Sequence, residues 1–329
     1  MIITPGHPDF FINRKRYTEV EVELPKFALG GFFRGCALKE GEVMRSFGME
    51  VPAPNLITNG GLDAVGSGLA WSRMHLGTGT TPPRFTDTAL TTFGVNVSPS
   101  DPSVTQGYAP SSPYYGMCLY TWTSAVGGAT GNWTEIGVSN QNTTGNLWSH
   151  ALILDNTSSP TVFTVQADEQ FQGSYELQLY APSSDILTSI TLGTNTYDTI
   201  TRALRVTNNA WAPYWSGAST AYGRFYPRVG SQTNSTGFYS GGIAAVTAAA
   251  PAGTGLASSA GTIAASSYSS GSYTRDTSLR MGSGQAVGSW RTIAWRMATA
   301  ELQVQLDPAL TKLTTEEVIF NMRMAWARR

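Results

Sequence analysis

The sequence has little cysteine, histidine or charge. It contains 2 cysteines and 3 histidines in 329 residues, and charged residues make up 13% of it, about half of the ~25% usual in globular proteins. Two cysteines are too few for a disulfide scaffold or a cysteine metal site in a chain of this length. We therefore expect Cys36 and Cys118 to be ordinary reduced thiols.

Neither sign of charge dominates, because the formal net charge is -1 and the pI is near 6.3. A chain without surplus positive charge offers no broad attraction for a polyanion, so we expect no nucleic-acid partner. No apolar run approaches the ~20 residues of a membrane-spanning helix. Residues 1–8 lack the basic-then-apolar order of a secretion signal. We expect a protein made in the cytoplasm that does not insert into membranes.

The patterns that usually mark an active site are missing as well. His7, His75 and His150 are isolated from one another, whereas metal sites usually show histidine or cysteine pairs at short spacing. No Gly-x-Ser-x-Gly motif is present, and no P-loop lysine follows residues 77–79. The sequence predicts no catalytic, cofactor-binding or metal-binding residues, and hence a protein that is not an enzyme.

Paired carboxylates would be the exception, because glycan-hydrolysing enzymes place two of them across the scissile bond. The adjacent pairs at 168–169 and 316–317 point to opposite faces if they lie on strands. Distant acids could still converge, and the candidates are Asp63, Asp87, Glu135 and Asp155. A polysaccharide depolymerase therefore stays open as a less favoured alternative.

The residues that are abundant favour β-structure. The chain has 35 glycines, 14 tyrosines, 13 phenylalanines and 9 tryptophans; aromatic side chains suit pleated sheets and glycine suits turns. Phe171, Tyr175 and Leu179 share one face of a strand predicted over 171–180, with polar residues on the other face. We predict a mainly β fold: an antiparallel β-sandwich with an N-terminal arm and long loops rich in Gly, Ser, Ala and Tyr.

Residues 1–54 are predicted to form the N-terminal arm or attachment segment. Val20, Val22 and Leu24 alternate with glutamates, which indicates a strand with one wet face, and Pro25 is expected to end it. The aromatic and glycine-rich stretch that follows suits close packing against a neighbour. Its candidate attachment residues are Phe27, Phe32 and Phe33. The alternative is that they cover the main core.

Residues 55–206 are predicted to form the central β-sandwich domain, beginning with an Asn-Gly-Gly turn at 59–61.

Residues 207–289 are rich in Ser, Gly, Ala and Tyr, with no acidic residue between Asp198 and Asp276. A stretch this long without periodicity is usually functional or disordered. Its aromatic residues form a candidate interaction surface: Trp211, Tyr214, Trp215, Tyr222, Phe225, Tyr226 and Tyr239. Contact with a partner surface and packing between subunits both remain open.

Residues 290–329 are predicted to form a C-terminal β-hairpin that closes the sandwich. Leu302, Val304 and Leu306 alternate with polar residues, and a second alternating run extends from Val318 to Trp326. The two runs are separated by a polar segment around 307–315, which we expect to be the hairpin turn.

Several sequence blocks, taken in order, resemble a class of tailed-bacteriophage tail fibre and virion structural proteins. They are 55–63 (NLITNGGLD), 75–83 (HLGTGTTPP) with 87–90 (DTAL), 131–138 (GNWTEIGV), 147–154 (LWSHALIL), 161–170 (TVFTVQADEQ) with 175–177 (YEL), and 320–329 (FNMRMAWARR). The resemblance covers about residues 55–180 and the last strand. It leaves residues 1–54 and 207–289 unmatched.

The resemblance implies a bacteriophage virion structural protein, a tail fibre or baseplate component that acts in tail assembly and host attachment. It implies location in the virion after synthesis in the host cytoplasm, without catalysis. The expected partners are copies of the chain itself, with a trimer favoured, other virion proteins, and a glycan or protein of the host surface. The alternative is a capsid decoration or other head-associated protein.

Overall fold

The computed structural model describes residues 17–50, 53–69, 71–97, 101–142, 144–208, 211, 237–256, 262–297 and 300–329. This part of the chain is mainly β, with multiple antiparallel sheets, which confirms the predicted fold class. Both cysteines are buried, and neither is in a disulfide bond within the described residues.

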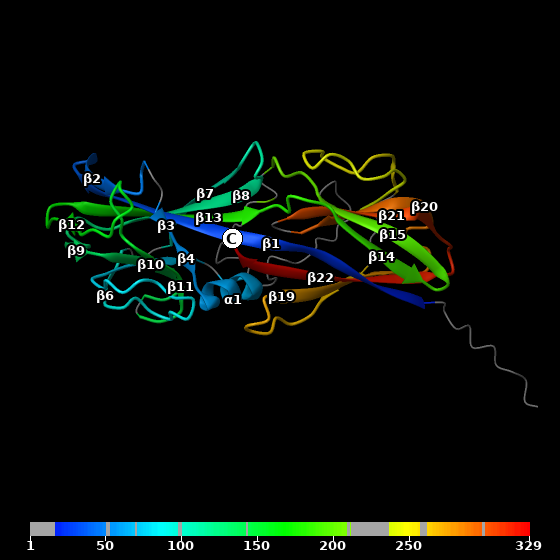
Figure 1. Cartoon of the computed structure of the whole chain (residues 1–329), viewed down its shortest axis with the longest axis horizontal. Coiled ribbons are helices and arrows are strands. Elements are labelled where there is room, and N and C mark those ends of the chain that lie inside the picture. Colours follow the sequence, from blue (N-terminus) through cyan, green and yellow to red (C-terminus); the bar gives the residue numbers. More distant parts are fainter. Residues whose placement is uncertain are drawn as a thin grey trace, which may run out of the picture.

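One long strand, β1 (Tyr17–Lys39), runs through the molecule (Figure 1). Its 23 residues exceed the 3–10 of most strands, and a strand of this length spans roughly 75 Å. From Tyr17 to Leu29 it pairs in parallel with β22 (Glu317–Arg328), and from Ala28 to Leu38 it pairs antiparallel with β13 (Gln170–Tyr180). The two halves of β1 therefore have different neighbours.

The described strands form four sheets, and β1 belongs to the largest of them. The nine-stranded sheet has the order β18 (Thr262–Ala265), β19 (Thr274–Met281), β22, β1, β13, β8 (Tyr115–Thr123) and β7 (Ser103–Tyr108), with β2 (Glu42–Phe47) and β3 (Ala53–Pro54) also paired to β1. The five-stranded sheet has the order β4 (Leu56–Ile57), β11 (Leu147–Leu152), β10 (Glu135–Ser139), β5 (Arg73–Gly77) and β6 (Phe93–Asn96). The six-stranded sheet has the order β14 (Ile186–Leu192), β15 (Asn195–Ala203), β21 (Glu301–Lys312), β20 (Gly288–Arg296), β16 (Gly237–Tyr239) and β17 (Gly255–Leu256), and β12 (Phe163–Val165) pairs with β9 (Gly131–Trp133).

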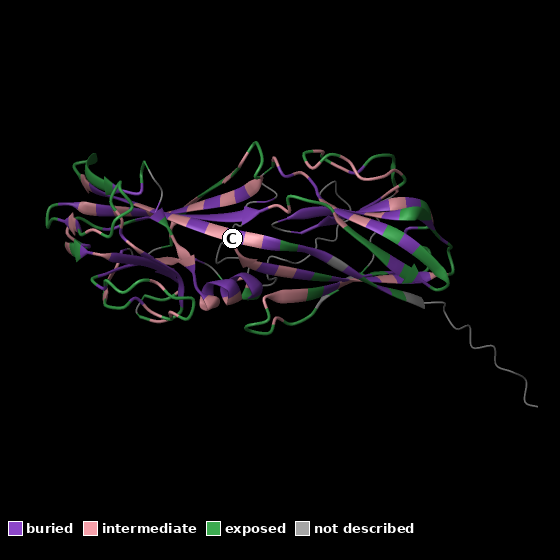
Figure 2. Ribbon diagram, viewed as in Figure 1, coloured by how far each residue is buried: buried purple, intermediate pink, exposed green. Residues whose placement is uncertain are grey.

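These sheets form two sandwiches that share the nine-stranded sheet. In the first sandwich, the half of that sheet around β13 packs on the five-stranded sheet, and the ring of Trp71 stacks on Tyr175 with centroids 5.2 Å apart. In the second sandwich, the half around β22 packs on the six-stranded sheet, where Trp290 lies 5.9 Å from Phe320. One buried cluster of apolar side chains extends through both, and Figure 2 shows buried residues along the strands in both halves of the molecule.

This arrangement corrects the predicted domain boundaries. Residues 1–54 are not simply an arm, because β1 lies inside the nine-stranded sheet. Residues 55–206 do not form one sandwich, since β14 and β15 belong to the second one. The described part of 207–289 contains β16, β17, β18 and β19 rather than loop alone.

The predicted C-terminal hairpin is wrong, although both of its strands exist. β21 pairs with β15 and β20, whereas β22 pairs with β1 and β19 in the other sheet. The alternation of apolar residues identifies a strand and its buried face but not its neighbour. The chain crosses between the two layers of the second sandwich after Lys312.

Pro25 does not end β1 as predicted. The register with β22 shifts between Glu23 and Lys26, so the proline lies at an irregularity of the ladder. Proline is tolerated at a bulge because its missing N–H need not pair there. The strand continues for 14 residues beyond it, to Lys39.

The segment predicted as an Asn-Gly-Gly turn is the start of a helix, α1 (Asn59–Ser67). Thr58 caps it by accepting a hydrogen bond from the N–H of Gly61 at 3.1 Å. A Cβ on Gly61 would lie 2.1 Å from the carbonyl oxygen of Trp148, so only glycine permits this close contact with β11. In the first half of the same helix, Trp326 of β22 donates from its indole N–H to the carbonyl of Leu62 at 2.9 Å.

We predict that Trp326→Ala lowers the free energy of unfolding by about 3–5 kcal/mol, because it removes a fully buried indole and a hydrogen bond to α1. The measurement is urea denaturation followed by circular dichroism. Val318→Ala on the same strand is the control and should cost much less, since fewer buried atoms are removed. Equal losses for the two variants would contradict the role given to Trp326.

Candidate functional site

The predicted interaction surface is not a single exposed surface. Trp211 is completely buried; its indole N–H donates to the carbonyl of Leu204 at 2.8 Å, and its ring lies 6.0 Å from Phe27. This corrects the expectation for Trp211, since a side chain without accessible surface cannot contact a partner. Tyr239 is partly exposed on β16. The remaining candidates lie outside the described residues: Tyr214, Trp215, Tyr222, Phe225 and Tyr226.

The predicted attachment segment is divided between two faces of β1. Phe27 and Phe33 are fully buried, and the ring of Phe33 lies 4.8 Å from Tyr175. They form part of the core of this chain, which is the alternative that the sequence left open, and the attachment role is wrong for them. Phe32 points to the opposite face, beside Glu176 of β13, and is half-buried.

A buried group of three ionisable residues lies on the five-stranded sheet. The imidazole of His150 on β11 bonds through Nδ1 to Asp87 Oδ2 at 2.8 Å and through Nε2 to Glu135 Oε2 at 2.9 Å. Glu135 on β10 has no exposed surface and His150 has 1%. We call these three residues the carboxylate–histidine cluster.

The cluster holds the long loop between β5 and β6 against the sheet. Glu135 accepts backbone hydrogen bonds from the N–H groups of Gly79, Thr91 and Thr92 at 2.8–3.0 Å. A Cβ on Gly79 would lie 2.4 Å from Glu135 Oε1, so a glycine at this position gives the carboxylate access to the backbone. Asp87, within the same loop, is the second partner of His150.

The hydrogen bonds determine the protonation states of the cluster. Burial alone would raise the pKa of Glu135, but the bonds from His150 and from the three backbone N–H groups outweigh it and lower the pKa to about 2. Burial alone would lower the pKa of His150, but its bonds to Glu135 and Asp87, together with their negative charges, raise the pKa above its usual value. Both ring nitrogens of His150 face carboxyl oxygens, so the arrangement favours the doubly protonated imidazolium form of the ring.

This arrangement suits a structural role better than a catalytic one. A histidine acting as a general base needs one ring nitrogen free to take a proton from a substrate, and both nitrogens of His150 are bonded to carboxylates. Asp87 and Glu135, two of the acids that could converge on a glycan, do converge, but on His150. The other two lie elsewhere: Asp63 accepts bonds from Tyr268 at 2.5 Å and Ser270 at 2.7 Å, and Asp155 lies in an exposed turn.

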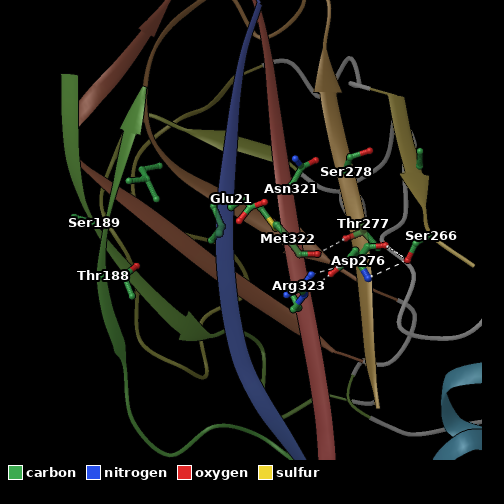
Figure 3. A pocket seen from close by; sticks show the side chains of 13 residues that line it. Glu21, Thr188, Ser189, Ser266, Asp276, Thr277, Ser278, Asn321, Met322 and Arg323 are labelled. Carbon is green, nitrogen blue, oxygen red and sulfur yellow. Dashed lines mark hydrogen bonds and ion pairs between the residues drawn. The ribbon is translucent and has the colours of Figure 1, made fainter. Parts of the chain in front are cut away.

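A groove of about 690 Å³ opens between β14 and the sheet of β1, β22 and β19 (Figure 3). Asp276 and Arg323 form an ion pair on its wall at 2.8 Å. Glu21 also lines it and has no ion-pair partner among the described residues. Buried Val22, Ile190 and Met322 line it too, so the groove reaches the apolar core.

Sequence reasoning missed both the cluster and the groove. It considered Asp87 and Glu135 as separate acids and His150 as an isolated histidine, because they are spread over residues 87–150. They meet only when β10 pairs with β11 and the loop between β5 and β6 brings Asp87 to His150. The two glycines at 77 and 79 were the one local sign in the sequence that another group lies close to the backbone there. The groove has no local signal, since it lies between strands from four distant parts of the chain.

The sequence blocks that carry the phage resemblance lie in contact with one another. Block 55–63 meets block 147–154 where the N–H of Thr58 donates to the carbonyl of Trp148 at 3.0 Å. Block 75–83 meets block 131–138 through Gly79 and Glu135, and block 87–90 meets block 147–154 through Asp87 and His150. Block 161–170 pairs with block 131–138 through β12 and β9, and the last block reaches α1 through Trp326.

Comparison of the chain with protein-family models, with curated proteins and with solved structures gave no match. Within the described ranges, no group of three or more His, Cys, Asp or Glu residues has an arrangement that could hold a metal ion. No helix in this part of the chain is long and apolar enough to cross a membrane.

The pKa directions predict how stability depends on pH. His150 has a raised pKa, so its contribution is complete below about 6.5, the value of an unfolded histidine, and is lost as the pH rises through the folded value. Glu135 has a lowered pKa, so its contribution is complete above about 4.5 and is lost as the pH falls towards 2. We expect His150→Gln to flatten the alkaline decline in the free energy of unfolding, measured by urea denaturation from pH 5 to 9.

His75→Gln is the matched control for that measurement. His75 is buried on β5 of the same sheet, and burial lowers its pKa, so replacing it leaves the alkaline decline in place. A decline that survives His150→Gln unchanged would contradict the charged state assigned to His150.

We predict that Gly79→Ala detaches the loop between β5 and β6, because the new Cβ would displace the Glu135 carboxylate. Overpacking of this kind costs typically about 1–3 kcal/mol. Trypsin should then cut faster at the exposed Arg84 of this loop. Gly282→Ala is the control, since its Cβ would meet its nearest neighbour at an ordinary 3.4 Å. Equal cutting rates in the two variants would refute the prediction.

Proposed function

We propose that this chain is a structural component of a bacteriophage virion, a tail fibre or baseplate protein that takes part in tail assembly. The observation that carries the proposal is the contact among the resemblance blocks. Blocks that are distant in the sequence form one buried unit around α1, β10, β11 and the carboxylate–histidine cluster. The resemblance therefore rests on residues that determine the first sandwich rather than on scattered surface positions.

The chemistry of the described residues supports a structural role without catalysis. The buried charges are used in contacts within the chain: Glu135 with His150, Glu301 with Arg205 at 2.9 Å, and Glu169 with Arg45. Such pairs with a buried carboxylate contribute little net stability, and we assign them the role of fixing how segments fit together. A particle component that must keep one shape is well served by such contacts.

Host attachment is the second part of the proposal, and we assign it to residues 207–289. Tyr239 is its one candidate aromatic residue that is partly exposed among those described. Tyrosine gives contact area at small entropic cost, which suits a recognition surface. Buried residues such as Trp211 do not contact the host in this proposal and only support the recognition surface.

The test is to locate the chain in purified phage particles. We expect immunogold particles against this protein at the tail, and a copy number in quantitative mass spectrometry at the level of tail proteins rather than of major head proteins. Labelling of the head at high copy number would instead support a capsid decoration protein. Absence from the particle, or release of reducing ends from host polysaccharide by the purified protein, would contradict the proposal.

A further inference from the structure

One end of the long molecule is formed by the hairpin of β1 and β2 together with two neighbouring segments. β2 and β12 lie at the left end of Figure 1. Arg45 of β2 donates to the carbonyl of Thr164 on β12 at 3.1 Å, and the N–H of Gly127 donates to the carbonyl of Glu169 at 2.8 Å. We call the segments joined in this way the tip, and they are residues 39–50, 124–130 and 155–169.

The tip exposes apolar side chains. Single exposed apolar residues are normal on a protein surface, whereas a group of them at one place marks an interaction site. Methionine in such a group adapts to the shape of a partner. The tip carries five of the eleven exposed large hydrophobic residues in the described part of the chain, each of them 50–63% exposed: Val43, Met44, Met49, Val126 and Val162.

The tip is also acidic. Its three segments contain six acidic and two basic residues, which gives a net charge of -4 in a chain whose total is -1. Both basic residues form ion pairs with acids of the tip itself. Glu40 and Glu42, beside the turn of the hairpin, are exposed and have no ion-pair partner among the described residues. A partner that complements this surface is therefore both apolar and basic.

Residues 1–16, which precede the described part of the chain, have this complementary composition. We call them the arm. Their last seven residues, 10–16, read FFINRKR, in which three large apolar residues are followed closely by three basic ones. The arm contains a single acid, Asp9. It therefore matches the tip in both respects, with apolar residues for the apolar surface and positive charge for the unpaired glutamates.

The arm is too short to reach the tip of its own molecule. It ends where β1 begins, at Tyr17, whereas the tip begins at Lys39, the last residue of the same strand. The 23 residues of β1 span roughly 75 Å, and Figure 1 shows this strand running along the long axis of the molecule. Sixteen residues reach at most about 55 Å when fully extended. An arm that binds a tip therefore binds the tip of another copy.

We propose that the arm of one molecule binds the tip of the next, so that copies of the chain associate end to end. The apolar run at 10–12 covers the exposed apolar side chains of the tip, and the basic run at 14–16 faces Glu40 and Glu42. Two different surfaces meet in such a contact, so it can repeat from copy to copy into a ring or a filament. This inference rests on the proposed function in expecting copies to associate, and it identifies the surfaces that they use.

The first test places a lysine at one of two exposed apolar positions. Met44→Lys adds a positive charge to the tip, where the basic arm binds, whereas Leu187→Lys makes the same kind of change on β14, outside the tip, at a residue that is 72% exposed. We expect analytical ultracentrifugation to show equal self-association of the wild type and Leu187→Lys. Met44→Lys should weaken self-association by about tenfold or more. A monomeric wild type, or equal association of the two variants, would overturn the proposal.

The second test reverses the charges of the two surfaces in separate proteins. One variant combines Arg14→Glu with Arg16→Glu in the arm, and the other combines Glu40→Lys with Glu42→Lys in the tip. Each variant alone should associate weakly, because like charges then meet. A mixture of the two should associate as the wild type does, since the acidic arm of one meets the basic tip of the other and the unchanged surfaces also match.

A mixture that stays dissociated, while both variants give the circular dichroism spectrum of the wild type, would overturn the contact between arm and tip. The position of the protein in the phage particle is measured separately. Failure of this inference is therefore distinguishable from failure of the proposed function.

Discussion

The hydrogen-bonded ladder of β1 is the constraint on which the rest of the structure depends. The strand pairs with β22 along its first half and with β13 along its second, and both ladders include Ala28 and Leu29. Each sandwich therefore uses a part of the same strand as a component of its own sheet. Neither sandwich can lose its half of β1 without leaving backbone groups of its neighbours unpaired. The two sandwiches consequently form one structural unit.

Buried polar contacts attach particular segments of the chain to the framework of sheets. The carboxylate–histidine cluster attaches a long loop to the outer side of the five-stranded sheet, and Asp63 attaches the segment before β19 to α1 through Tyr268 and Gly271. In both places a carboxylate satisfies backbone or hydroxyl donors of a segment that has no strand partner. The chain has few charged residues, and several of them are used in this way. This explains how a protein with low charge retains well-defined loops without a metal ion or a disulfide bond in the described residues.

The sequence predicted the local structure well and the long-range structure poorly. The alternation from Phe171 to Leu179 identified β13 and its buried face, because a two-residue period is a local property. The partners of β21 and β22 were assigned incorrectly because proximity in the sequence favours a hairpin, while the layers of the second sandwich require a crossover. Trp211 was read as a surface residue because its neighbours are small and polar, yet its contact with Phe27 comes from the other end of the chain. The carboxylate–histidine cluster could not be predicted for the same reason: its three members meet only after the five-stranded sheet has formed.

The account makes the shared strand its central claim, and native-state hydrogen exchange tests it most directly. The amides of β11 in the first sandwich and of β21 in the second can be followed in one experiment at increasing urea concentration. If β1 unites the sandwiches, the slowest amides of both strands exchange with the same free energy and the same dependence on urea, because both need global unfolding. A lower free energy and a weaker urea dependence for one of the two strands would show that its sandwich opens alone, and would contradict the account.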